Sequence, residues 1–369
     1  MQRLIAFTLA FIWLSIPAFA LEPEPLRCSY PLFGSIKKYN EEISGIKCLS
    51  DAEDSYSCFI VADEKKGLQQ LTIWKSGRNS YECTPGPVLA KKRGLSCLKG
   101  KKPERDFEAI ASDGKQLFIT GSWGNRRKKH VGKSPERWVL VRQKLAGIDD
   151  LSGKCEAVKR KYLKSFIKST LPSLRPFIDA PLQCGGLNIE GLAYQNNKLF
   201  FGLRSPGVIR SGVGLVMETS ARGIFSGQPQ TRLHKLKFSA YGKPIRGVGI
   251  RALEPVDDDH ILIATGAGGV SMDKLSEEGE YRIASTCKSQ AGPFYSNKVF
   301  KQPGALWLWT SATGAVKFLG AISGAYQGHK LEGVGVLSRT KTKLELVLAF
   351  DGVDNSQMSP LATVSIDFN

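Results

Sequence analysis

Three glutamates occupy equivalent places in a recurring pattern, and they are the strongest candidates for chemistry in this chain. Glu108, Glu190 and Glu332 each stand near the start of an apolar segment and are followed by alanine or glycine. Carboxylates that share one site repel one another unless a proton or a cation offsets their charge. If the three converge, they are candidate catalytic residues. They are also candidate ligands for a hard cation such as calcium, with water completing the coordination shell.

Two weaker copies of the pattern place Ser44 and Arg251 at the equivalent position. Arg251 offers a second way to neutralise the carboxylates, because it can pair with one or two of the glutamates as a structural plug. The sequence leaves the plug and the metal site open as alternatives.

A second repeated position lies at the end of the strand that follows each of these segments. Its occupants are Asp63, Ser122, Arg204, Thr265 and Asp351. We take Arg204, Arg251, Ser122, Asp63 and Asp351 as candidate ligand-binding residues. Arg204 either holds a phosphate or carboxylate through two parallel hydrogen bonds or is a buried arginine that satisfies loop carbonyls. Whether this position faces the same rim as the glutamates is open from the sequence.

The elements that carry these residues are five pairs of strands. Each pair consists of the segment with the candidate residue, a short polar turn and a second apolar segment, and the pairs recur at roughly 60 to 80 residues. A unit repeated in this way indicates blades around an axis, so we predict an all-β protein with a β-propeller fold. Five units are readable, and five to seven blades are compatible with the length. The innermost strands of a propeller border its central channel, where the glutamates would meet.

The two ends of the chain have distinct patterns. Residues 1–20 combine Arg3, an apolar run and Ala18-Phe19-Ala20, which is typical of a secretory signal cleaved after Ala20. Residues 21–369 are expected to form one propeller domain, periplasmic or secreted, with no transmembrane segment. Both ends of that domain, residues 26–36 and 361–368, are strand-like. We expect the two ends to complete one blade together and so remove an open edge.

Two insertions interrupt the repeats. The first covers about residues 150–175 and contains a basic amphipathic helix over residues 154–170, which Pro172 ends. Its apolar side lies either on an anionic membrane or, as we expect, on the parent domain. The second insertion, about residues 266–302, is irregular. The triplet Asp257-Asp258-Asp259 lacks the ligand spacing of a calcium loop, so we expect a hairpin turn there.

All eight cysteines follow the predicted signal, and an even number in an exported protein favours disulfides. Their spacing does not match a zinc site. We expect Cys48 to pair with Cys58 across the first hairpin, and Cys155 to pair with Cys184 around the helical insertion.

The formal net charge is +18, or +17 after removal of Arg3 with the signal. This balance favours an anionic small molecule or an acidic surface as partner, unless the basic loops serve only solubility. Nucleic acid fits less well, because the basic run of residues 126–130 has only Trp123 nearby for base stacking. The sequence does not indicate an oligomeric state.

The paired segments resemble an uncharacterised bacterial family, domain of unknown function 3616. The resemblance is carried by Phe107–Ala111 with Leu117–Ser122 and by Ile189–Ala193 with Leu203–Pro206. More distantly, the chain resembles the esterase-like domain of phytase. The resemblance covers nearly all of residues 21–369 and implies a propeller, but the nearer family has no settled reaction to carry over. Its loop after the second repeat is commonly rich in Ser and His, whereas Trp123 follows Ser122 here.

Most catalytic signatures are missing from the sequence: it has no G-x-S-x-G elbow, H-E-x-x-H motif or phosphate-binding Walker loop. We therefore consider two functions. The first is a module that binds an anionic phosphate or carboxylate ester in the channel, and as a metal-assisted, esterase- or phosphoesterase-like hydrolase cleaves it. In that function a calcium-like ion would polarise the ester and a channel glutamate would activate water. The second is a non-enzymatic interaction scaffold whose basic loops dock an acidic surface or a partner protein.

Overall fold

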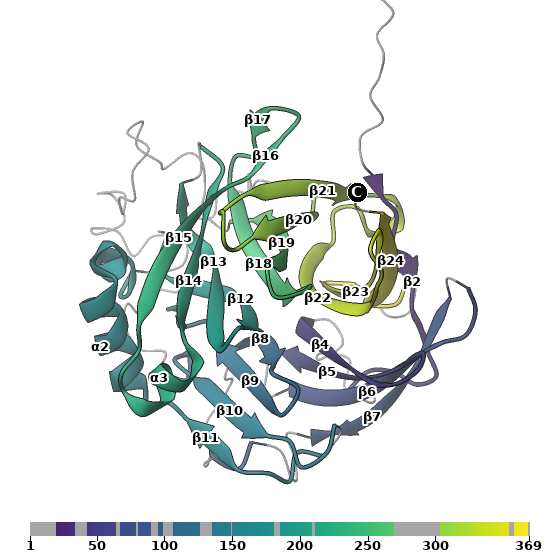
Figure 1. Cartoon of the computed structure of the whole chain (residues 1–369), viewed down its shortest axis with the longest axis horizontal. Helices are drawn as coiled ribbons and strands as arrows, with labels where there is room; N and C mark the ends of the chain where they lie inside the picture. Colours follow the sequence, from purple (N-terminus) through teal and green to yellow (C-terminus); the bar gives the residue numbers. More distant parts are fainter. Residues whose placement is uncertain are drawn as a thin grey trace, which may run out of the picture.

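Five blades surround a central axis in the computed structural model of this chain (Figure 1). The structure describes residues 20–33, 43–63, 67–78, 80–89, 95–98, 106–125, 135–148, 150–180, 185–208, 211–268, 303–353 and 358–367. The innermost strands contact one another in a closed cycle, in the order β4, β8, β12, β18, β22 and back to β4. The β-propeller fold is therefore confirmed, with five blades.

Each blade is an antiparallel meander of three or four consecutive strands that starts at the axis. Blade 1 contains β4 (Ile43–Ala52), β5 (Ser55–Ala62), β6 (Gly67–Lys75) and β7 (Tyr81–Val88). Blade 2 contains β8 (Phe107–Ser112), β9 (Gln116–Gly121), β10 (Leu140–Lys144) and β11 (Cys155–Ala157), and blade 3 contains β12 (Asn188–Gln195), β13 (Lys198–Val208), β14 (Val213–Ser220) and β15 (Thr231–Lys237). Blade 4 contains β18 (Val248–Pro255), β19 (His260–Ala267), β20 (Ala305–Thr310) and β21 (Val316–Ile322), and blade 5 contains β22 (Lys330–Arg339), β23 (Lys343–Asp351) and β24 (Leu361–Asp367). A small hairpin of β16 (Ser239–Ala240) and β17 (Lys243–Pro244) follows blade 3.

The second strands are continuous apolar runs because each blade is covered on both faces by its neighbours. In β13, Phe200 and Phe201 are both buried although they point to opposite faces. The ring of Phe200 meets Trp309 of blade 4 edge-on at 5.7 Å, and that of Phe201 lies 5.0 Å from Trp123 of blade 2. Because both faces of such a strand are buried, it appears in the sequence as a continuous apolar run. The repeats can therefore be recognised from the positions of these runs.

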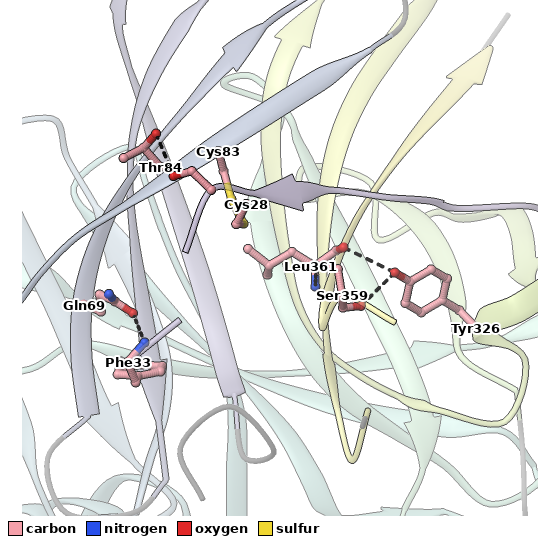
Figure 2. Close-up of a disulfide and its surroundings, with 9 residues drawn as sticks. Cys28, Phe33, Gln69, Cys83, Thr84, Tyr326, Ser359 and Leu361 are labelled. Atoms are coloured by element: carbon pink, nitrogen blue, oxygen red, sulfur yellow. Dashed lines mark hydrogen bonds between the residues drawn. A yellow bond between two sulfur atoms is a disulfide. The ribbon is translucent and has the colours of Figure 1, made fainter. Parts of the chain in front are cut away.

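The N-terminal segment runs along the outer edges of three consecutive blades. Its short strands β1 (Ala20–Leu21), β2 (Glu24–Pro25) and β3 (Arg27–Cys28) pair with β21, β24 and β7, on blades 4, 5 and 1. Leu26 N donates to Leu361 O at 2.9 Å. Cys28 forms a disulfide with Cys83 (Figure 2). Both ends of the chain do meet in blade 5, but through β2 and β24. The prediction was wrong about the N-terminal residues, because the strand within residues 26–36, β3, pairs with blade 1.

Three disulfides join cysteines of the described residues, and one of the two predicted pairings is wrong. Cys48 pairs with Cys58, as predicted, because the two face each other across the first hairpin. Cys155 pairs with Cys97 and not with Cys184. The reason is that Cys155 begins β11, and Cys97 packs beside it against the same apolar cluster of blade 2. Cys184 and Cys287 lie outside the described residues.

The predicted helix is present as α2 (Arg160–Thr170), but it begins later than residue 154 because Cys155–Ala157 form the outer strand of blade 2. Leu163, Phe166 and Ile167 are buried in the cluster between blades 2 and 3, so its apolar side lies on the domain. A 3₁₀ segment (Pro172–Phe177) follows it, and a short helix α3 (Ala221–Ser226) follows β14. The second predicted insertion lies outside the described residues from 269 to 302. Among the described residues, no helix is long and apolar enough to cross a membrane.

The Asp257 triplet forms the predicted turn between β18 and β19. Asp257 Oδ1 accepts from the backbone N–H groups of Asp259 and His260, both at 2.8 Å. An aspartate that binds the backbone two and three residues on is a common turn device.

Candidate functional site

The five innermost strands share one irregularity, and it coincides with the repeated position found in the sequence. Each strand slips in register against its partner at a single residue near its start. The skipped residues are Ser44, Glu108, Glu190, Arg251 and Glu332, which we call the mouth layer. A β-bulge of this kind re-aims the extra side chain and is common beside functional sites. The fold therefore gathers these five residues at one end of the axis.

The residue after each bulge is glycine or alanine because neighbouring inner strands approach closely there. A Cβ built on Gly191 would lie 3.0 Å from Leu253 Cγ on blade 4, and one on Gly333 would lie 3.1 Å from Ile46 N on blade 1. Distances this short are rare for real side chains, so a larger residue would push the blades apart. The Glu-Gly motif is thus partly a packing motif.

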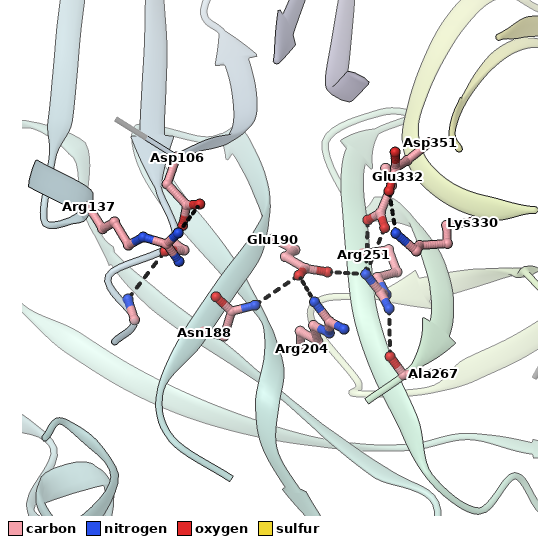
Figure 3. A network of polar contacts seen from close by, with 12 residues as sticks. Asp106, Arg137, Asn188, Glu190, Arg204, Arg251, Ala267, Lys330, Glu332 and Asp351 are labelled. Atoms are coloured by element: carbon pink, nitrogen blue, oxygen red, sulfur yellow. Dashed lines mark hydrogen bonds and ion pairs between the residues drawn. The ribbon is translucent and has the colours of Figure 1, made fainter. Parts of the chain in front are cut away.

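Arg251 ties two of the three glutamates together. Its Nη1 donates to Glu190 Oε2 at 2.6 Å and to Glu332 Oε1 at 2.7 Å, while Nη2 donates to Ala267 O at 2.7 Å (Figure 3). All three charged side chains are at least nine-tenths buried. Burial favours the neutral form of Arg251, but Glu190 and Glu332 outweigh it and raise the pKa of the guanidinium above its ordinary value.

Glu190 is the most fully bonded carboxylate of the mouth layer. Its Oε1 accepts from Arg204 Nη1 at 2.6 Å and from Asn188 Nδ2 at 2.8 Å, in addition to the Arg251 bond at Oε2. Burial alone would raise the pKa of Glu190. The guanidinium groups of Arg204 and Arg251 outweigh it and hold the pKa below its usual value. Glu190 is therefore a fixed negative charge.

Glu332 has less support, since it shares Arg251 with Glu190. Burial raises the pKa of Glu332 to about 7; Arg251 opposes the rise and the negative charge of Glu190 adds to it. This carboxyl therefore changes its charge near neutral pH.

Glu108 differs from the other two glutamates. No hydrogen bond joins its carboxyl to another described residue, and it is only half-buried. Burial, followed by the negative charges of Asp106, Glu190 and Asp63, raises its pKa well above the usual range. The shift favours the protonated form of a carboxyl that is not fully buried, which is the form a general acid requires.

Three of the five strand-end residues share the mouth layer's rim. Arg204 contacts Glu190 directly, Asp351 pairs with Lys330 Nζ beside Glu332, and Asp63 acts electrostatically on Glu108. This settles the question left open by the sequence. An antiparallel hairpin returns the end of its second strand to the start of its first.

The other two strand-end residues serve the core. Ser122 is fully buried, and its backbone carbonyl accepts from Ile189 N at 2.8 Å, which links blade 2 to blade 3. Thr265 Oγ1 accepts from Trp307 Nε1 at 2.8 Å within blade 4.

The site also contains polar residues two positions before the bulge, which were not predicted from the sequence. Asn188 binds Glu190, Lys330 binds Asp351, and Asp106 pairs with Arg137 Nη2 at 3.0 Å (Figure 3). Because these residues precede Glu190, Glu332 and Glu108 by the same interval, the repeat itself carried the signal.

The predicted calcium ligands do not form a joint site with one another. Arg251 Nη1 lies between Glu190 and Glu332 at hydrogen-bonding distance from both. In the part of the chain that the structure describes, no group of three or more His, Cys, Asp or Glu residues is placed to hold a metal ion. The geometry matches the plug alternative for these two glutamates, and calcium binding stays a prediction.

The fold and the site together define a five-bladed propeller with a buried ion cluster at one end of its axis. The model of the family described as "Protein of unknown function (DUF3616)" matches residues 153–367, more than half of the chain. The chain belongs to this family. No curated protein matches it. The distant resemblance to phytase stays a prediction.

Solved structures of glycoside hydrolases share only the general arrangement. The α-L-arabinofuranosidase of Podospora anserina, solved in complex with cellotriose, is 9% identical with a TM-score of 0.43, and the alignment covers 95% of this chain and 97% of that one. The catalytic domain of a GH62 α-L-arabinofuranosidase from Coprinopsis cinerea is 8% identical with a TM-score of 0.42, covering 95% and 98%. A glycosyl hydrolase from Bacteroides ovatus is 10% identical with a TM-score of 0.41, covering 93% and 90%. At these values the substrates of those enzymes carry no argument for this chain.

Proposed function

We propose that the mouth layer binds a small ester carrying a phosphate or carboxylate group and hydrolyses it by general acid–base chemistry. Water would form the new bond to the phosphorus or carbonyl carbon, and Glu108, as the general acid, would donate its proton to the leaving oxygen as the old bond breaks. The proton that the water releases would restore the Glu108 carboxyl. The observation that carries the proposal is the contrast between two carboxyls of one layer: the pKa of Glu108 is raised, with no basic group bonded to it, and the pKa of Glu190 is lowered by Arg204 and Arg251. Environments that push the pKa values of neighbouring carboxyls apart are how hydrolases assign acid and charge-stabilising roles at neutral pH.

Charge balance in the cluster supports an anionic ligand. Each ionised acid described around Glu190 and Glu332 faces a base: Glu190 faces Arg204 and Arg251, and Asp351 faces Lys330. With Glu108 protonated, this cluster would not repel an anion. Arg204 would bind it, because its buried Nε has no hydrogen-bond partner among the described residues. A guanidinium presents several donors in a fixed fork that matches phosphate and carboxylate.

Calcium is the least supported part of this proposal. A bound divalent cation would polarise the ester oxygen and so lower the demand on Glu108. The glutamates bound to Arg251 do not fit such an ion, so we assign no step to it. Assays with added calcium and with chelator test it.

Export completes the proposal. The three disulfides are typical of proteins in an oxidising compartment such as the periplasm or the extracellular medium. Cleavage after Ala20 would leave Leu21 as the first residue. Leu21 is already anchored, because its carbonyl accepts from Ser323 N at 2.9 Å.

The test is turnover of two anionic esters whose alkoxide leaving groups need a proton, glycerol 2-phosphate and monomethyl succinate, by the protein and by Glu108→Gln. We expect the variant to lose about 100-fold or more of the activity, which is typical for removal of a general acid, with little change in Tm. The matched control is Glu82→Gln, since Glu82 is an exposed glutamate of β7, three strands out from the inner strand of blade 1. Wild-type inactivity on every ester, or an equally active Glu108→Gln, would contradict the proposal.

A second candidate function is docking to an acidic surface. Helix α2 exposes Lys159, Lys161 and Lys168 and has no acidic residue in its first turn, where the helix dipole favours one. Binding of this kind would fall steeply with salt and survive Glu108→Gln. Retention on immobilised heparin at increasing salt, compared with a Lys159→Gln/Lys161→Gln variant, separates the two functions.

A further inference from the structure

A second buried ion pair lies on the inner strands, away from the mouth layer. Lys47 Nζ is 2.7 Å from Glu254 Oε1, and only 10% and 2% of these side chains are exposed. Lys47 follows Ser44 by three positions on β4, and Glu254 follows Arg251 by three positions on β18. At a rise of about 3.3 Å per residue, the pair lies about 10 Å deeper along the axis than the mouth layer.

The order of the strands determines where this pair runs. Strands β4 and β18 are not neighbours, because β22 lies between them in the closed cycle of inner strands. A direct contact between their side chains must therefore lie between β22 and the axis. Consistent with this route, Val336 N of β22 donates to Glu254 Oε1 at 3.4 Å. The pair crosses the axis rather than lying within one blade.

The remaining inner strands add no polar side chain at the equivalent positions. The equivalent positions, three after the bulge, are Ala111, Ala193 and Gly335. Burial raises the pKa of Glu254, with Lys47 opposing the rise, as expected for a site that water does not reach. A buried ion pair is a poor stabiliser, because desolvation cancels most of the attraction between its charges. Its place across the axis thus needs an explanation other than stability.

We infer that the Lys47–Glu254 pair blocks the central channel, so that a ligand can reach the mouth layer from one end of the propeller only. This inference rests on the proposed function and narrows its substrate class. The ligand is a compact ester, or the end of a longer chain, that reaches Glu108 from the mouth side. A polymer threaded along the axis is excluded as substrate.

Closure is tested without any ligand, by hydrogen exchange at the Val336 amide. Truncation with Lys47→Ala/Glu254→Ala should speed exchange at least about 10-fold, because water then reaches the axis from the far side. The size-matched Lys47→Met/Glu254→Leu should keep exchange slow, because it removes the charges and keeps the volume. The Ile119 amide in blade 2 reports any general loss of stability. Unchanged exchange at Val336 in the truncated variant, relative to Ile119, would overturn the inference.

The substrate class is tested with long-chain polyphosphate as probe. End-wise attack releases orthophosphate while the remaining chains stay long, whereas internal cleavage produces intermediate lengths at once, which would overturn the inference. If neither polyphosphate nor the two esters named above are hydrolysed, the proposed function fails. The exchange experiment still decides whether the pair closes the axis.

Discussion

Arg251 Nη1 donates to Glu190 Oε2 at 2.6 Å, and this bond joins blade 4 to blade 3 at the centre of the propeller. The same nitrogen also reaches Glu332 of blade 5. One arginine therefore links three successive blades where their backbones approach most closely. Its removal would leave Glu332 buried without the base that faces it.

Replacement of Arg251 should destabilise the fold strongly. We expect Arg251→Met to lower the free energy of unfolding by about 3–5 kcal/mol, because it leaves an uncompensated buried carboxylate. Urea denaturation at neutral pH measures this. The double variant Arg251→Met/Glu332→Met should recover part of the loss, since it removes both partners. A single variant within about 1 kcal/mol of the wild type would show that the pair is dispensable.

The raised pKa of Glu332 predicts how stability depends on pH. A carboxyl whose pKa is higher in the folded than in the unfolded chain binds more protons when folded, so stability falls as pH rises. For Glu332 the fall runs from about pH 4.5, its ordinary value, to about 7, and is complete above that. Its size is on the order of 3 kcal/mol.

The measurement is the difference in unfolding free energy between the wild type and Glu332→Gln at a series of pH values. Because Gln does not titrate, the difference isolates this one group. The wild type should lose stability relative to the variant across this range. A difference that does not vary between pH 4.5 and 7 is the opposing result.

The disulfide at the N-terminal segment should matter more than the one in the first hairpin. Cys28 and Cys83 are 55 residues apart, whereas Cys48 and Cys58 are 10 apart. The loop-closure model gives the longer link about 1.5 kcal/mol more stabilisation. Paired Cys→Ser variants of each disulfide, compared by thermal unfolding, test this ranking. An equal or larger loss from the hairpin pair would mean that the N-terminal segment contributes little to ring closure.

Gly191, which follows the bulge of β12, should not tolerate a methyl group. We expect Gly191→Ala to cost about 1–3 kcal/mol, because the new Cβ would meet Leu253 at 3.0 Å and Gly191 is fixed between two blades. Gly77→Ala is the control, since the nearest atom to its new Cβ would be 3.6 Å away. Unfolding free energies that do not separate the two variants would refute the packing role.

Much of the fold could be predicted from the sequence because a propeller repeats its register. A residue at one position of one blade has its equivalent at that position of every other blade, so Glu108, Glu190 and Glu332 could be brought together without coordinates. The same repeat limited the blade number to between five and seven, and the need to cover an edge strand indicated that both chain ends share one blade.

The remaining features depend on contacts between blades, which no single repeat encodes. Cys97 lies between the strands of blades 1 and 2, outside the repeat, so the sequence spacing favoured the wrong partner for Cys155. The N-terminal segment pairs with three blades through strands of two residues each. Such strands are too short to show the alternation of apolar and polar residues that marks a strand in the sequence. The different protonation of the three glutamates could not be predicted either. It depends on which basic groups reach each carboxyl.

The protonation of Glu108 is the most direct test of the account. A ¹³C NMR titration of the glutamate carboxyls, with Glu108 assigned by the signal missing from Glu108→Gln, measures its pKa without a substrate. We predict a midpoint well above the ordinary 4.5, and the general-acid role requires that Glu108 still carry its proton at neutral pH. A midpoint at or below 4.5 would show that Glu108 is ionised there and would contradict its role as the acid of the site.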